Sequence, residues 1–322
     1  MRKNMKKIIA LLLSLVLCAA FCVGCSGKKE ENGKLKIVTT IYPLYEWVKN
    51  ITDGVQNADT TLLLSKGADM HSFQPTSKDI VTISDCDVFV YVGGESDKWV
   101  EDILNNARNK DMLCLNLMDA LGSAAKEEKT VEGMQAEQHD EGEESDEKEY
   151  DEHIWLSLKN ASALCRHIAD KLGEKDNADK ATFDSNASSY IAKLDALDGQ
   201  YAQAIKESKN DTLIFADRFP FRYLTNDYGL HYYAAFAGCS AESEASFKTL
   251  VFLADKLKEL HLTKLMTIDG SDQKIARSVI DTAGIADVKV LTLNSMQSDS
   301  GTSGSYLTLM EQNLSVLKEA LN

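Results

Sequence analysis

Leu35-Lys36-Ile37-Val38-Thr39-Thr40 decides the fold class, because this β-branched strand pattern is followed at once by residues 41–51, whose apolar positions lie on one face of a helix. The same order recurs downstream. We predict strands at residues 60–64, 87–92 and 112–117, and helices at residues 78–84 and 99–107. Strands that alternate with helices form mainly parallel sheets covered on both faces. Ligands of such α/β sheets bind beyond the carboxyl ends of the strands.

A second alternating region begins at residue 212. Its predicted strands are residues 212–216, 230–234, 264–268 and 288–293, and its predicted helices are residues 220–226, 245–260, 273–282 and 305–321. Between the two regions, residues 177–208 carry apolar side chains at intervals of three and four, which predicts one long amphipathic helix.

The amino terminus has the pattern of an export signal. Residues 1–7 are basic, residues 8–23 are apolar, and Gly24-Cys25 follows. This arrangement resembles a bacterial lipobox in which Cys25 is lipidated, although Cys22 stands where Leu is usual. Ordinary secretion with cleavage nearby is the alternative. Both alternatives place the mature chain outside the cytoplasmic membrane.

Charge and cysteine content exclude several classes of protein. The formal net charge is −15, which would repel the phosphates of nucleic acids. The mature chain contains Cys86, Cys114, Cys165 and Cys239, whose spacing fits neither a zinc ribbon nor a dense disulfide framework. Export permits a disulfide, but the sequence leaves the pairing open, and single buried thiols are the default expectation.

Two loop histidines are candidate metal ligands. His71 lies in Gly67-Ala68-Asp69-Met70-His71-Ser72-Phe73-Gln74-Pro75, between a predicted strand and the next helix, and His153 lies in Asp151-Glu152-His153-Ile154-Trp155-Leu156. A single loop histidine is more often solvated, and a polar loop that buries one Trp would explain the second stretch. Two histidine loops at the carboxyl edge of one sheet favour a metal site.

Together, the lipobox, the His71 loop, the acidic insertion and the His153 stretch resemble the ZnuA/TroA-like family. These are zinc- and manganese-binding lipoproteins that serve ABC importers. The resemblance implies two Rossmann-like α/β lobes with mainly parallel sheets, joined by one long helix, with the metal between the lobes. It also implies a monomer on a lipid anchor, an ABC permease and ATPase as partners, and no enzymatic activity. The corresponding segments are a signal peptide at 1–25, a tether at 26–34, an N-terminal lobe at 35–175, a linking helix at 176–209 and a C-terminal lobe at 210–322.

Residues 124–150 fit the variable insertion of the family. Acidic residues dominate this run, which holds a single histidine, His139, so its composition predicts a disordered, solvated loop. Weak capture of cations by the carboxylates is the functional alternative. We expect residues 126–149 to be dispensable for folding.

The resemblance also implies ligands from the second lobe. Asp269 follows a predicted strand where the family has an acidic ligand, although an aspartate there would also cap the next helix. The third family ligand falls on Arg218, whose guanidinium cannot coordinate a cation. We therefore expect Asp217 to be the ligand, with Arg218 and Glu152 acting from outside the ligand set, and His231 to be a core residue. Zinc suits this set best, and manganese remains compatible with it.

Other functions remain open. An exported zinc hydrolase would need an His-Glu-x-x-His motif or a nucleophile elbow, and the sequence contains neither. A protein that binds an anionic solute or a metal chelate through Arg218 and Arg222 is the non-enzymatic rival, as is an adhesin with a structural metal.

Overall fold

The computed structural model describes residues 33–64, 68–135, 149–240, 244–299 and 301–322. The predicted signal peptide, the lipidation site Cys25, most of the tether, Gly67 and His139 lie outside these residues. No helix within the described residues is long and apolar enough to cross a membrane.

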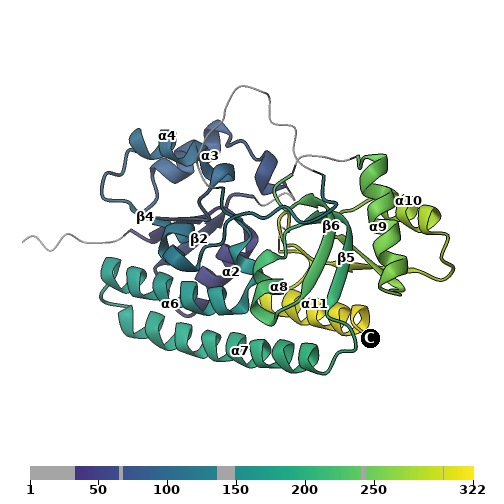
Figure 1. Ribbon diagram of the computed structural model, residues 1–322. Helices are drawn as coiled ribbons and strands as arrows, with labels where there is room; N and C mark the ends of the chain where they lie inside the picture. Colours follow the sequence, from purple (N-terminus) through teal and green to yellow (C-terminus); the bar gives the residue numbers. More distant parts are fainter. Residues whose placement is uncertain (1–32, 65–67, 136–148, 241–243, 300) are drawn as a thin grey trace, which may run out of the picture. The chain divides into compact units, whose positions relative to one another are not determined.

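Two four-stranded parallel sheets form the framework (Figure 1). The first sheet has the order β2-β1-β3-β4, and the second has the order β6-β5-β7-β8. The strands of the first are β1 (Leu35–Thr39), β2 (Ala58–Leu62), β3 (Val88–Tyr91) and β4 (Leu113–Asn116). Those of the second are β5 (Thr212–Phe219), β6 (His231–Ala237), β7 (Lys264–Ile268) and β8 (Lys289–Leu293).

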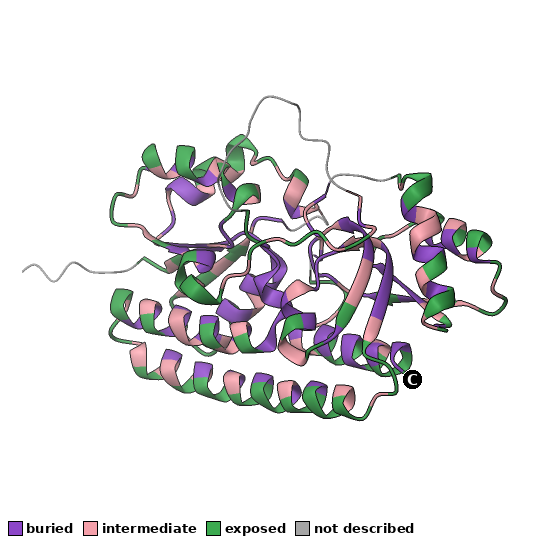
Figure 2. Cartoon of the chain, in the orientation of Figure 1, coloured by how far each residue is buried: buried purple, intermediate pink, exposed green. Residues whose placement is uncertain are grey.

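Helices connect the strands, as the alternating pattern predicts. The first region contains α2 (Tyr42–Ile51), α3 (Ser77–Ser84), α4 (Trp99–Asn105), α5 (Leu117–Leu121), α6 (Leu158–Lys175) and the short helices η1 (Met70–Ser72), η2 (Glu95–Asp97), η3 (Gly122–Ala124) and η4 (Ile154–Leu156). The second contains α8 (Arg222–Tyr228), α9 (Phe247–Glu259), α10 (Lys274–Ala283) and α11 (Tyr306–Ala320). Buried residues concentrate on the strands and on the inner helix faces (Figure 2).

The long helix α7 (Lys180–Lys206) contacts both regions, since it packs on α2 and α6 of the first and on α8 and α11 of the second. Two side chains of α7 anchor it at opposite ends. Asn186 donates hydrogen bonds to Ile51 O at 3.0 Å and to Asp53 O at 2.8 Å, and the Tyr201 hydroxyl donates to Met310 O at 2.5 Å. Side chains of both regions also share one hydrophobic core.

Strand β5 continues beyond its predicted end at residue 216, because its pairing with β6 resumes after an irregularity between Phe215 and Arg218. Asp217 therefore lies within the strand and does not follow it. The apolar run that predicted this strand ends at Ala216, whereas backbone pairing carries the strand on through two charged residues to Phe219.

The flanks of the acidic insertion are ordered, which corrects the expectation that the whole of 124–150 is a solvated loop. Glu128 N donates to Glu149 O at 2.8 Å, and Gln135 N donates to Ala235 O at 2.9 Å. Ala235 belongs to β6, the edge strand of the second sheet, so the insertion supplies a partner to an edge that would otherwise be open. The described flanks of the insertion therefore contact the fold, and the dispensability of residues 126–149 stays a prediction. Composition could not reveal this, because backbone pairing does not depend on apolar side chains.

Candidate metal centre

His71 lies in the short helix η1, beyond the carboxyl end of β2. Asp69 caps this helix, since its carboxylate accepts a hydrogen bond from His71 N at 3.0 Å. The side chain of His71 is 11% exposed. A capped turn therefore fixes the backbone that carries the imidazole.

His153 precedes η4 and is completely buried. One carboxylate oxygen of Asp151 accepts from His153 N at 2.9 Å and lies 3.0 Å from His153 Nδ1. This contact places a proton on Nδ1 and leaves the lone pair on Nε2, which is the arrangement usual for a histidine that binds a metal through Nε2.

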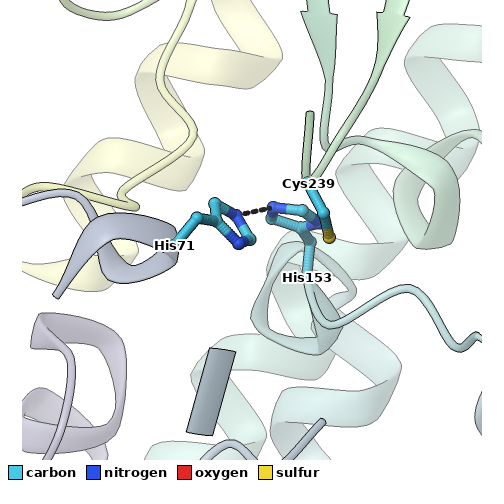
Figure 3. Close-up of side chains that lie close together, drawn as sticks. All are labelled: His71, His153 and Cys239. Carbon is cyan, nitrogen blue, oxygen red and sulfur yellow. Dashed lines mark hydrogen bonds between the residues drawn. The ribbon is translucent and has the colours of Figure 1, made fainter. Parts of the chain in front are cut away.

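The two imidazoles face each other through their Nε2 atoms, which lie 3.1 Å apart (Figure 3). Two nitrogens bound to one tetrahedral zinc ion, at about 2.0–2.1 Å from it, would lie roughly 3.3 Å apart. The separation in the structure is therefore close to that required for joint coordination.

Hydrogen bonds also fix the second nitrogen of His71. Nδ1 lies 2.8 Å from Ser96 Oγ and 3.6 Å from Glu152 Oε2. The other carboxylate oxygen of Glu152 accepts from Ser96 N at 2.8 Å. Burial lowers the pKa of His71 to about 3, with a further contribution from His153, so the imidazole is neutral near pH 7 and keeps a lone pair. Burial raises the pKa of Glu152.

The side chain of Arg218 pairs with Asp69. Its guanidinium donates to Asp69 Oδ2 at 2.9 Å, and Asp69 is the residue that caps the His71 turn. Burial works to raise the pKa of Asp69, but the hydrogen bond and charge of Arg218 prevail, with help from His71, and lower it. Arg218 thus influences His71 through Asp69. The ion pair of Arg218 with Asp69 joins a strand of the second sheet to the turn that carries His71.

The structure does not bring Asp217 and Asp269 into the histidine group. One oxygen of Asp217 accepts from Arg218 N at 2.9 Å, and the other lies 3.5 Å from Ile268 N. Asp269 Oδ1 accepts from Ser295 N at 2.6 Å. Asp217 nevertheless lines a cavity of about 520 Å³ together with His71 and Arg218.

Cys239 is the residue that joins the two histidines. One ligand atom each from His71, His153 and Cys239 all lie within 4.8 Å of one another, and within the described residues this is the one such trio of His, Cys or acidic side chains. Burial raises the pKa of the Cys239 thiol well above its usual value, nearby carboxylates add to the rise, and the backbone of Glu152 works against it. The sequence offered one signal for Cys239, its position five residues beyond the predicted end of the strand at 230–234.

Gln297 is a second residue that sequence analysis missed. Its Nε2 lies 2.9 Å from His153 Nε2, its side chain is 2% exposed, and its carbonyl oxygen has no hydrogen-bond partner among the described residues. A buried carbonyl without a partner is costly and therefore points to a group that is absent from the structure.

His231 is exposed at the first residue of β6, so it is not the core residue we expected. It lines a cavity of about 570 Å³ with Arg222, separate from the cavity that contains Arg218. Arg218 and Arg222 therefore do not converge on one anion. All four cysteines of the described residues are free thiols, with Cys86 and Cys165 buried and Cys114 exposed.

Comparison with known proteins agrees with this geometry. The family described as "Zinc-uptake complex component A periplasmic", ZnuA, matches residues 37–320. The chain belongs to this family. The resemblance to the ZnuA/TroA-like family is thereby confirmed, and with it the two-lobed α/β fold.

Relatives of the ZnuA family cover nearly the whole chain. The zinc-binding lipoprotein AdcA of Streptococcus pneumoniae TIGR4 is 35% identical over 317 residues, which are 98% of this chain and 61% of the relative. The chain thus spans less than two thirds of that relative. The high-affinity zinc uptake system protein ZnuA of Bacillus subtilis 168 is 29% identical over 313 residues, 95% of this chain and 94% of the relative.

Solved structures of the family share the fold. The Zn(II)-bound ZnuA-like domain of S. pneumoniae AdcA has a TM-score of 0.70 at 30% identity, over 90% of this chain and 99% of that one. The metal-dependent lipoprotein YcdH of B. subtilis has a TM-score of 0.71 at 27% identity, over 90% of this chain and 100% of that one.

Proposed function

We propose that this protein is an extracytoplasmic zinc-binding protein that delivers the ion to the permease and ATPase of an ABC importer, as a monomer held to the membrane by lipidated Cys25. The observation that carries the proposal is the pair of Nε2 atoms 3.1 Å apart, each on an imidazole whose Nδ1 is already hydrogen-bonded. Fixed imidazoles coordinate without a large loss of side-chain freedom.

His71 and His153 are the first two ligands in this proposal. Asp269 supplies a carboxylate, and Asp217 is the alternative donor. Asp217 already accepts backbone hydrogen bonds through both oxygens, at 2.9 and 3.5 Å, so it must give up contacts in order to bind the ion. We therefore expect Asp269→Ala to weaken zinc binding more than Asp217→Ala. Manganese would accept the same imidazoles and carboxylates with additional oxygen donors.

Titration calorimetry of metal-free protein tests the proposal. We expect one tightly bound zinc ion per chain, and a loss of at least about tenfold, roughly 1.4 kcal/mol, in both His71→Ala and His153→Ala. His231→Ala is a matched control, because His231 is exposed and lines a different cavity. Unchanged affinity in both site variants would refute the ligand assignment.

The rival proposal, an anionic solute or a metal chelate, makes a different prediction. Arg218 is already paired with Asp69, and Arg222 lines another cavity. A protein that bound no bare cation but took up a metal only as an anionic chelate would favour the rival.

A further inference from the structure

The carboxylates proposed above are the donors from the second sheet, but neither Asp217 nor Asp269 belongs to the group of possible ligand atoms that contains the two histidines. Arg218 occupies the position at which the resemblance places the third ligand, and its guanidinium is bound to Asp69. The donor that the resemblance places at position 218 would therefore have to come from another residue near the carboxyl edge of this sheet.

Cys239 lies at that edge, two residues beyond the end of β6. Its Sγ and one ring nitrogen of each histidine all lie within 4.8 Å of one another, and Figure 3 shows the three side chains converging from separate segments. In a tetrahedral zinc site, sulfur at about 2.3 Å and nitrogen at about 2.0–2.1 Å from the ion would be roughly 3.6 Å apart. Because no two of these atoms are more than 4.8 Å apart, sulfur and nitrogen would have to approach by at most about 1.2 Å, within reach of a side-chain rotation.

The backbone of Gly238, the residue before Cys239, packs closely against the His153 ring. A Cβ added to Gly238 would lie 2.8 Å from His153 Cε1 and 2.9 Å from Phe219 O. Only glycine lets this segment approach so closely, and the approach is what holds Cys239 beside the histidines.

The surroundings of the trio independently indicate a bound group. Gln297 presents a buried carboxamide to His153 Nε2, and its carbonyl oxygen is unpartnered within the described residues. Glu152 Oε2, on a side chain that is 1% exposed, is likewise without a hydrogen-bond partner there. Such acceptors would be satisfied by water or protons in the shell of a bound ion.

We propose that Cys239 is the third protein ligand of the ion and binds as a thiolate. This inference rests on the proposed metal-binding function. On binding, the thiol loses its proton to solvent and the sulfur lone pair forms the metal–sulfur bond, with no change of oxidation state. The thiolate offsets one of the two positive charges of the ion. A site with two imidazoles and one thiolate favours zinc over manganese, which prefers oxygen donors.

Substitution with Co(II) provides a direct test, because a cobalt–thiolate bond gives a charge-transfer band in the near ultraviolet that nitrogen and oxygen ligands do not give. We expect this band in the unaltered protein and in Cys114→Ser, which removes an exposed thiol. In Cys239→Ser, the band should disappear while the visible bands of bound cobalt persist. The same variant should bind zinc at least about tenfold more weakly and lose part of its preference for zinc over manganese.

The outcomes separate the two proposals. If cobalt and zinc do not bind the unaltered protein, the proposed function fails. If cobalt binds without the charge-transfer band and Cys239→Ser keeps full zinc affinity, the function stands and the Cys239 assignment is overturned. If Cys239→Ser misfolds, thiol alkylation of the unaltered protein tests the assignment instead. Bound zinc should then protect Cys239 from alkylation and leave Cys114 reactive. Equal modification of Cys239 with and without zinc refutes the assignment.

Discussion

Arg218 illustrates how a residue that cannot bind a cation can still serve a cation site. Its contact with Asp69 stabilises the carboxylate that caps the His71 turn, so it acts on the proposed ligand His71 through the backbone of that residue. Arg218 lies in β5 of the second sheet, Asp69 lies in the segment that follows β2 of the first, and their side chains are 22% and 28% exposed. An ion pair of this exposure contributes modestly to stability, because water competes for both charges.

We expect Arg218→Ala to weaken zinc binding by less than about tenfold, because the lost contact loosens the His71 turn without removing a ligand. Asp69→Asn keeps a capping oxygen but removes the charge, so it should have a similar effect, and the double variant should be little worse than either single one. Calorimetric titration of all three would measure the coupling. Abolished binding in Arg218→Ala beside normal binding in Asp69→Asn would show that Arg218 contacts the cargo itself.

The sequence predicted that His71 and His153 lie close together, because each was expected in a loop at the carboxyl edge of the same sheet, and the structure places the two side chains in contact. It did not find Cys239 or Gln297, because their relevance depends on segments that meet only in the folded chain. Asp217 was expected to end a strand, but β5 runs on to Phe219. Whether the two aspartates bind the ion stays a prediction.

At the scale of elements, the ordered flank of the insertion protects the edge of β6. Gly133 makes this packing possible, since its φ is +78° and a Cβ would lie 1.9 Å from the ring of Phe252 on α9. The flank therefore joins β6 to α9. Alternating apolar patterns predicted both of these elements, but the covering segment is too polar for such patterns to detect.

Gly133→Ala should destabilise the fold by about 1–3 kcal/mol or more, since it adds both backbone strain and a clash with an aromatic ring. Gly54→Ala is a matched control, because Gly54 has a φ of +76° and nothing lies within 4 Å of the added Cβ. Denaturant unfolding of both variants would separate the cost of backbone strain, which both share, from the cost of the clash with Phe252, which only Gly133→Ala has. Equal losses of stability would mean that Phe252 moves aside freely and that the flank is loosely packed.

At the scale of the whole molecule, α7 and the shared core connect the two regions. The hydroxyl of Tyr306 in α11 donates to Trp155 O at 2.6 Å, and the indole of Trp155 donates to Ser295 O at 2.8 Å. These buried contacts cross between the regions close to His153. We therefore expect the ion to be released by small loop movements near the site and not by a wide hinge. The sequence predicted the long helix from its apolar stripe, but not these polar contacts.

The stability of the metal-free molecule should also depend on pH through Asp97. Burial raises the pKa of this carboxyl from 3.8 to about 7, and the nearby charge of Glu152 adds to the rise against a hydrogen bond from Gly93 N. The folded state thus holds a proton that the unfolded state releases between these pH values. Stability from this group is present below pH 3.8 and is lost as the pH rises to about 7.

Asp97→Asn keeps an acceptor for Gly93 N and removes the titration. The free energy of unfolding of this variant, relative to the unaltered protein, should therefore increase as the pH rises from 5 towards 7, by at most about 1.4 kcal/mol per pH unit, and then level off. Urea unfolding at a series of pH values provides the measurement. A constant difference between the two proteins across this range would show that Asp97 is ionised throughout.

Metal binding should stabilise the whole molecule, because the proposed ligands come from loops of both sheets and no unfolded chain would hold them together. Free zinc at about 100 times its dissociation constant should raise the free energy of unfolding by about 2.7 kcal/mol. Differential scanning calorimetry would show this as a higher melting temperature that a chelator reverses. His153→Ala should lose most of the shift, whereas His231→Ala, which changes an exposed residue of a separate cavity, should retain it. The same zinc-dependent shift in His153→Ala would place the stabilising ion elsewhere and remove the link between this site and the stability of the fold.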